Sequence, residues 1–197
     1  LGGASRVACG GQDVGIQLSG AHTGELAAEM LADAGARWVI VGHSERRIEQ
    51  AEKDDLVAAK AAAALRGGLR PIICVGETLA ERDGGLEFAV VARQLEAVVE
   101  QVDVAGLAKG AVAYEPVWAI GTGKTASATQ AQEMHAFIRD KLAGIDADIA
   151  ERMRIVYGGS VNAENAAKLF DQADIDGGLI GGAGLDPQVF TEIVKIA

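Results

Sequence analysis

Six short apolar runs constrain most how this chain can fold. Each run is followed by a polar or glycine-rich turn and then by a helix-forming stretch. The runs lie at 6–12, 37–43, 71–76, 111–116, 154–159 and 177–182, and the predicted helices include 25–34, 54–66, 86–102, 129–142, 164–170 and 187–196. This alternation is typical of a parallel sheet covered by helices on both faces. The sequence therefore predicts an α/β fold of six βα units. Such units could form either an open doubly wound sheet or a β/α barrel.

The composition limits the number of domains and the kinds of partner. The 197 residues show no linker or break in composition, so we expect one domain spanning 1–197. Acidic residues (28) exceed basic ones (18), for a formal net charge of −10. Nucleic acids and anionic membranes bind basic surfaces, so neither is an expected partner, whereas a small anionic ligand could still bind locally.

The distribution of apolar residues and cysteines indicates a cellular location. No apolar stretch reaches membrane-spanning length, and we expect no signal segment. Cys9 and Cys74 both lie in apolar runs. We therefore expect two buried, reduced thiols and a cytoplasmic protein.

Polar and reactive residues gather where the predicted strands end. These ends carry Gln12, the sequence GHSERR at 42–47, Gly76 and Glu77, Glu115, and the glycine-rich stretches 158–160 and 181–182. The starts of the strands carry mostly single charges and turn residues. Because parallel α/β folds place their sites at the carboxyl ends of the strands, this asymmetry favours a site there, although glycine can also serve a plain turn.

Glu115 ends the fourth run and precedes a stiff Pro-Val-Trp sequence and a Gly-Thr-Gly sequence. Alone, a glutamate at the end of a strand could equally be a surface acid. A base that must be dry during reaction and wet between turnovers needs a mobile lid, which this hinge and these glycines favour. The predicted lid comprises Pro116, Val117, Trp118, Ala119, Ile120, Gly121, Thr122, Gly123 and Lys124. A phosphate loop is excluded, because that motif requires glycine where Trp118 stands.

His43 follows the second run directly. A lone histidine there would ordinarily be a satisfied core residue, but Glu45 and the arginines at 46–47 supply charges and hydrogen-bond partners. We expect His22 to be solvated or at an interface, and His135 to be structural. No pair of histidines or cysteines has the spacing of metal ligands, so no metal is expected.

Glycines also end the last two runs, at 158–159 before Ser160 and at 181–182. They let backbone N–H groups converge on a ligand, and in β/α barrels the loops after the last two strands often bind phosphate. Neither run contains a dinucleotide-binding fingerprint, so no cofactor is expected. With Glu115 as a base and His43 as an imidazole, the pattern favours proton transfer next to the carbonyl of a small phosphorylated molecule.

Several motifs resemble one enzyme family. The sequences GHSERR at 42–47, AYEPVWAIGTGKT at 113–125, YGGSV at 157–161 and GGLIGGAGL at 177–185 closely resemble triosephosphate isomerases, and SGAHTGE at 19–25 resembles their long third loop. The resemblance implies a TIM (β/α) barrel-like fold without a cofactor. It also implies interconversion of dihydroxyacetone phosphate and glyceraldehyde 3-phosphate through an enediolate, in glycolysis and gluconeogenesis.

The resemblance implies a role for each matching residue. Glu115 would take a proton from the carbon next to the carbonyl, and His43 would polarise that carbonyl as a neutral imidazole. The phosphate would be held by Gly121, Ser160, Gly181 and Gly182. Glu45 would support the site, and Thr23 would reach a partner subunit.

The printed sequence departs from the family at its start. It begins at what matches the third strand, so the first strand, first helix, second strand and an asparagine–any–lysine motif have no counterpart. Losing an electrostatic contact such as that lysine can cost roughly 3–4 kcal/mol in a transition state. Two alternatives therefore stay open. One is a phosphate-ligand-binding protein with little or no turnover, and the other is a barrel remnant that an N-terminal fragment complements.

Two features bear on self-association. Six parallel strands leave two edges that a closed barrel lacks. Because an exposed strand edge can pair with another chain, we expect a homodimer or another homo-oligomer. In the loop that resembles the family's dimer loop, Asp13 stands where asparagine is usual and His22 where an aromatic residue is usual.

Overall fold

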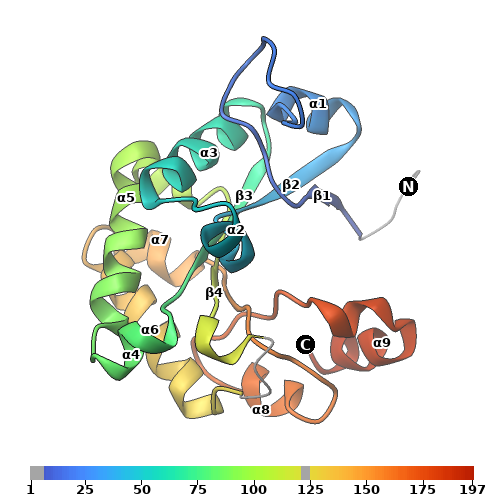
Figure 1. Cartoon of the computed structure of the whole chain (residues 1–197). Helices are drawn as coiled ribbons and strands as arrows, with labels where there is room; N and C mark the ends of the chain where they lie inside the picture. The colour runs from blue at the N-terminus through green and yellow to red at the C-terminus, as the bar shows by residue number, and fades with distance from the viewer. Residues whose placement is uncertain (1–6, 121–124) are drawn as a thin grey trace. The chain divides into compact units, whose positions relative to one another are not determined.

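The computed structural model describes residues 7–120 and 125–197 (Figure 1). The chain divides into two compact units. The first unit comprises Leu1–Ile73 and Glu96–Ala111, and the second comprises Cys74–Leu95 and Val112–Ala197. Strand β3 (Arg70–Val75), helix α5 (Glu87–Leu107) and, through its first residue, strand β4 (Ala111–Tyr114) contribute residues to both units. The single domain spanning 1–197 stays a prediction.

The first unit is built on parallel strands. Strands β1 (Cys9–Gly11), β2 (Ala36–Val41) and β3 are neighbours in that order, and β2 pairs with β3 from Trp38 opposite Arg70 to Val41 opposite Ile73. Its helices are α1 (Ala28–Asp33), α2 (Ser44–Glu49) and α3 (Asp54–Arg66). Helices α1 and α3 contact β2 and each other (Figure 1).

Helix α3 shows why the sequence pattern predicts these elements. Its apolar face is made of small residues spaced by three or four positions, and the fully buried ones are Val57, Ala61 and Ala64. Gly67 ends the helix, and a Cβ atom at that position would overlap Ala28 of α1. Small side chains therefore allow α1 and α3 to pack closely over the strands.

The second unit repeats the strand–helix order. Its elements are α4 (Leu79–Asp83), β4 (Ala111–Tyr114), α6 (Ala128–Ala143), α7 (Ala147–Arg152), β5 (Ile155–Tyr157), α8 (Ala166–Phe170) and α9 (Pro187–Ile196), with 3-10 turns η1 (Val117–Ala119) and η2 (Gly182–Leu185). Strand β4 pairs in parallel with β5, from Val112 opposite Ile155 to Tyr114 opposite Tyr157. Helix α6 contacts β5, α7 and α8.

His135 lies in the core of the second unit. It is fully buried on α6, and its Nδ1 donates to the carbonyl oxygen of Ala131 at 2.7 Å, since a carbonyl can only accept. The ring of Tyr114 meets it edge-on, with centroids 5.6 Å apart, and the ring of Tyr157 lies 6.2 Å away. The structural role predicted for His135 is confirmed.

Helix prediction succeeded for long periodic segments. The helices predicted at 54–66 and 187–196 have the observed bounds of α3 and α9, and those predicted at 86–102 and 129–142 lie largely within α5 and α6. The sequence did not predict α2, α4 or α7, which have only five or six residues each.

The sixth predicted strand, 177–182, forms only an isolated parallel bridge between Tyr157 and Gly178. Two hydrogen bonds of 2.9 Å accompany it, from the Tyr157 N–H to the Gly177 oxygen and from the Leu179 N–H to the Tyr157 oxygen. Four of the six residues of this run are glycine, and glycine disfavours strands because it loses most conformational freedom on ordering.

The prediction of two buried thiols is wrong for Cys9. Cys74 is buried, but Cys9 is exposed, because it lies in a three-residue strand at the end of the described strand order. In the described part of the chain, no helix is long and apolar enough to cross a membrane.

Candidate functional site

Glu115 follows directly after β4 and is 2% exposed. Its backbone N–H donates to the carbonyl oxygen of Val75, at 2.8 Å, which ties it to the end of β3. Pro116 then precedes the turn η1. The strand end therefore holds a nearly dry carboxylate on a fixed backbone.

Two glycines make room for Glu115. A Cβ atom on Gly76 would overlap the carbonyl oxygen of Glu115, and one on Gly158 would lie 2.8 Å from its Cγ atom. The Gly158 N–H also donates to the Tyr114 oxygen, at 2.7 Å, in register with the β4–β5 pairing. Glycine at these strand ends therefore provides space for an acid, in addition to any role in turning the chain.

Glu77 anchors the chain just after Glu115. Its side chain is fully buried, and Oε1 accepts from three donors: the Trp118 indole at 2.7 Å, the Arg82 Nη1 at 2.8 Å and the Tyr114 hydroxyl at 3.1 Å. Its backbone oxygen accepts from the Val117 N–H at 3.2 Å. The described first part of the predicted lid is thus held at two points by one residue.

The surroundings of Glu77 keep Arg82 and Tyr114 protonated, so that both can donate to it. Burial lowers the pKa of Arg82, but the hydrogen bond to Glu77 and the surrounding charges together outweigh it, and the pKa is raised. Burial, followed by the charge of Glu77, raises the pKa of Tyr114. Arg82 therefore stays charged and Tyr114 stays neutral, so both can donate. The Arg82 guanidinium also lies 4.9 Å from the centroid of the Trp118 ring, over its face.

His43 lies at the N-terminus of α2 in the first unit, and its side chain is 29% exposed. The Glu45 N–H donates to its Nδ1 at 3.3 Å. Because a nitrogen that accepts carries no proton, the neutral ring has its proton on Nε2. The Glu45 carboxylate is 3.9 Å from Nδ1 and 72% exposed, so it contributes little charge stabilisation.

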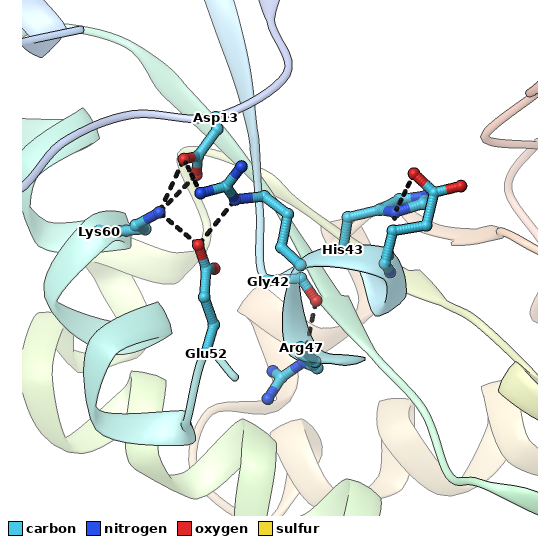
Figure 2. Close-up of polar contacts among 8 residues, drawn as sticks. Asp13, Gly42, His43, Arg47, Glu52 and Lys60 are labelled. Atoms are coloured by element: carbon cyan, nitrogen blue, oxygen red, sulfur yellow. Dashed lines mark hydrogen bonds and ion pairs between the residues drawn. The ribbon is translucent and has the colours of Figure 1, made fainter. Parts of the chain in front are cut away.

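Arg47 supports the backbone before His43. Its Nε donates to the Gly42 oxygen at 2.9 Å (Figure 2). Its Nη1 donates to Asp54 at 2.7 Å. Gly42 has φ +70, and a Cβ atom there would lie 2.6 Å from the Val57 Cγ1 atom. This turn requires glycine for both reasons.

A cluster of four charged residues lies elsewhere in the first unit (Figure 2). The Lys60 ammonium contacts Asp13 at 2.7 Å and Glu52 at 2.6 Å, and Arg46 contacts the same two carboxylates at 2.8 and 2.7 Å. The side chains of Lys60 and Glu52 are 4% and 2% exposed. Burial raises the pKa of Glu52, but the hydrogen bonds and charges of Lys60 and Arg46 together outweigh it, and the pKa is lowered. The two cations and two anions therefore neutralise one another.

Arg46 was expected to place charge beside His43, but it forms ion pairs with Asp13 and Glu52. A cavity of about 500 Å³ opens beside the cluster, with Arg46, Glu52, Lys60 and the loop 15–20 in its lining. Because Lys60 belongs to α3 and contacts Asp13, the cluster ties the segment around Asp13 to that helix.

The predicted phosphate-binding residues lie mostly in the second unit. Ser160 is exposed, and its carbonyl oxygen accepts from Asn165 Nδ2 at 3.0 Å. Gly181 and Gly182 are exposed at the start of η2, and a Cβ atom on either would meet nothing within 4 Å. Their backbone is therefore open to a ligand.

The remaining predicted residues are placed as follows. Pro116, Val117, Trp118, Ala119 and Ile120 form the turn η1 and its flanks, whereas Gly121, Thr122, Gly123 and Lys124 lie outside the described residues. Thr23 is exposed in the loop before α1, as is His22. His43 belongs to the first unit and Glu115 to the second.

Comparison with known proteins identifies the family. The family model described as triosephosphate isomerase matches residues 2–197. The chain belongs to the triosephosphate isomerase family. The triosephosphate isomerase of Thiobacillus denitrificans is 59% identical over 193 residues, which cover 98% of this chain and 78% of that protein.

Other triosephosphate isomerases match similarly. That of Ralstonia nicotianae is 58% identical over 96% of this chain and 76% of its own length, and that of Escherichia coli O139:H28 is 53% identical over 98% and 76%. The chain thus spans about three quarters of the length of these triosephosphate isomerases. The family match and the parallel strand–helix order together confirm the predicted TIM barrel-like α/β fold class.

Sequence reasoning missed residues that make the buried polar contacts of each unit. Glu77 was noted only as a strand-end residue, and neither Arg82 nor Lys60 was singled out. Lys60 carried a signal, because it lies on the face of α3 that is otherwise alanine and valine. Arg82 carried none, because a charged residue in a short exposed helix has no distinctive pattern.

Proposed function

We propose that this chain is an intramolecular aldose-ketose isomerase that interconverts dihydroxyacetone phosphate and glyceraldehyde 3-phosphate, acting without a cofactor in glycolysis and gluconeogenesis. The observation that carries the proposal is Glu115. It is a 2% exposed carboxylate at the end of β4, followed at once by a turn that Glu77 anchors. Membership of a family whose relatives are named triosephosphate isomerase supports the choice of substrate.

The proposed chemistry is proton transfer. The Glu115 carboxylate takes a proton from the carbon next to the substrate carbonyl, and the electron pair of that C–H bond moves to form the enediolate. His43, neutral with its proton on Nε2, donates a hydrogen bond to the carbonyl oxygen where negative charge develops. Glu115 then returns its proton to the neighbouring carbon. His43 gives its Nε2 proton to the former carbonyl oxygen and takes up the proton of the neighbouring hydroxyl, whose oxygen becomes the new carbonyl, so the isomerisation ends with no net gain or loss of atoms.

The proposed phosphate site consists of backbone and hydroxyl donors. We assign it to Gly121, Ser160, Gly181 and Gly182. The open space around Gly181 and Gly182 supports this assignment, because an anion can approach their backbone closely. The segment 116–124 is the proposed lid, and Glu45 is the proposed support for His43.

The chain is also proposed to be a cytoplasmic homodimer or another homo-oligomer. The loop that carries Thr23 supports self-association, because it exposes apolar side chains. Ile16, Leu18 and Leu26 are 36%, 60% and 48% exposed. A partner surface over this loop would remove their apolar area from water.

The test is the steady-state isomerisation rate of the purified chain beside a Glu115→Gln variant. Purification must exclude the host isomerase, because traces of it would mimic a weak enzyme. We expect the parent to turn over and Glu115→Gln to lose at least about a hundredfold in kcat, since the amide cannot accept the proton. Equal background rates in both proteins would refute the proposal.

Binding separates the isomerase from the phosphate-binding alternative. The probe is 2-phosphoglycolate, whose planar carboxylate beside a phosphate resembles the enediolate. Binding without turnover would support the alternative. Loss of both binding and turnover would support a remnant that needs a complementing fragment.

A further inference from the structure

The side chain of Gln94, on α5, forms hydrogen bonds with both the N–H and the carbonyl oxygen of Gly76. Its Oε1 accepts from the Gly76 N–H at 2.8 Å, and its Nε2 donates to the Gly76 oxygen at 3.1 Å. Gln94 is 5% exposed, and Gly76 is buried. Both hydrogen bonds are therefore shielded from water.

Gly76 needs these bonds because β3 has just ended at Val75. A buried N–H and carbonyl without partners would each be costly, so both must be satisfied. A primary amide carries both an acceptor oxygen and an N–H donor group, so one side chain can satisfy the N–H and the oxygen of Gly76 together. Gln94 thus continues the hydrogen bonding of the sheet by one residue beyond β3.

Gly76 lies in the middle of residues 75–77, which hydrogen-bond to the backbone that carries the proposed base. Within residues 75–77, the Val75 oxygen accepts from the Glu115 N–H, the Glu77 oxygen accepts from the Val117 N–H, and Glu77 Oε1 accepts from the Trp118 indole. Gly76 itself lies so close to the Glu115 carbonyl that a Cβ atom would overlap it. A shift of Gly76 would therefore move the backbone that carries Glu115.

We propose that Gln94 is a positioning residue for catalysis, which sets the location of the Glu115 carboxylate through Gly76. The inference rests on the proposed function, because it takes Glu115 to be the base. Gln94 touches neither substrate nor reacting atom in this scheme. It acts only by fixing residues 75–77.

The first test replaces Gln94 with methionine, which has a similar length but cannot donate or accept both hydrogen bonds. We expect kcat to fall by about 10- to 100-fold, the cost of a base displaced by up to about 1 Å. KM should change by less than about twofold, because the phosphate contacts lie elsewhere. Val91→Ala is the matched control. Val91 is fully buried on the same helix, and its truncation leaves both Gln94–Gly76 hydrogen bonds in place. An equal loss of kcat in both variants would overturn the proposal.

The second test is Gln94→Glu, which keeps the shape. As a carboxylate it repels the Gly76 oxygen, but as a neutral acid it can accept from the Gly76 N–H and donate to the Gly76 oxygen. We therefore expect the ratio of its kcat to that of the parent to rise as the pH is lowered from 8 to 6. A ratio that does not change with pH would contradict the proposal. Because this variant conserves volume, it also serves if the methionine variant does not fold.

Hydrogen exchange separates failure of this inference from failure of the proposed function. The amides of Glu115 and Val117 should exchange at least about tenfold faster in Gln94→Met than in the parent, while that of Ile138 on α6 stays unchanged. This readout does not need turnover, so it tests the positioning role even in an inactive parent. Unchanged protection at Glu115 and Val117 would refute it.

Discussion

Replacing Lys60 with methionine tests whether the charge cluster of Asp13, Arg46, Glu52 and Lys60 stabilises the first unit. The change keeps the length and apolar stem of the side chain but removes an ammonium that contacts Asp13 at 2.7 Å and Glu52 at 2.6 Å. The Glu52 side chain is 2% exposed, so water cannot replace the lost contact.

The expected cost follows from this burial. Breaking a buried ion pair by removing one partner costs about 3–5 kcal/mol, because the other charge is left uncompensated. Arg46 remains 2.7 Å from Glu52, so we expect the lower end, about 3 kcal/mol. An exposed pair would give less than about 1 kcal/mol.

The measurement is urea unfolding at pH 7 and pH 4. With m values of about 1–3 kcal/mol/M, the midpoint should fall by about 1 M or more at pH 7. The pKa of Glu52 lies below its ordinary value of 4.5, so its stabilisation is present above pH 4.5 and is lost as the pH falls through the lower folded value. The cost of Lys60→Met should therefore be smaller at pH 4 than at pH 7.

The control is the double variant Glu52→Gln/Lys60→Met, in which the loss of both charges should cost less than the sum of the single changes. A cost under about 1 kcal/mol at pH 7 would show that the cluster behaves as a surface pair. Equal costs at both pH values would show that the charge of Glu52 does not matter.

Three further predictions concern the second unit. Burial lowers the pKa of His135 to about 4, from 6.5, so the unfolded chain takes up the proton first. The stability that neutral His135 contributes should be complete above pH 6.5 and should decrease by about 3 kcal/mol as the pH falls to 4. Urea unfolding should therefore show that the free energy of unfolding of the parent falls more over this pH range than that of His135→Gln. Glu77→Gln should lower stability by about 2 kcal/mol, because a charged acceptor of three donors becomes neutral, and should change tryptophan fluorescence. A result within about 0.5 kcal/mol would contradict this. Gly76→Ala should lower kcat at least about tenfold by displacing the Glu115 carbonyl. Gly144→Ala, whose added Cβ would lie no closer than 3.4 Å to its neighbours, should not.

Local signals in the sequence predicted much of the fold. Helix α3 could be predicted to the residue because two aspartates begin it and a glycine follows it, and α9 because Pro187 lies in its first turn. The run 177–182 misled the prediction because its apolar pair, Leu179 and Ile180, lies between glycines that do not sustain a ladder. Helices α2 and α4 were missed because their residues resemble site motifs and turns.

The candidate acids and imidazole could be predicted from their places at strand ends, but their supports could not. Lys60 contacts a residue 47 positions away in the sequence, and Glu77 meets Trp118 across 41 positions. Gln94 reaches Gly76 across 18 positions. No local periodicity encodes such pairs, because folding determines which distant residues meet.

The unequal exposure of the two cysteines has a practical consequence. A thiol-reactive label should attach to Cys9 alone while the protein is folded, since Cys74 is buried in β3. Reaction at Cys74 requires the strand to open, so the mass of a second label on the chain would show that the strand had opened. Each molecule thus carries its own reporter of unfolding, and every variant described above could be assayed without adding a probe site.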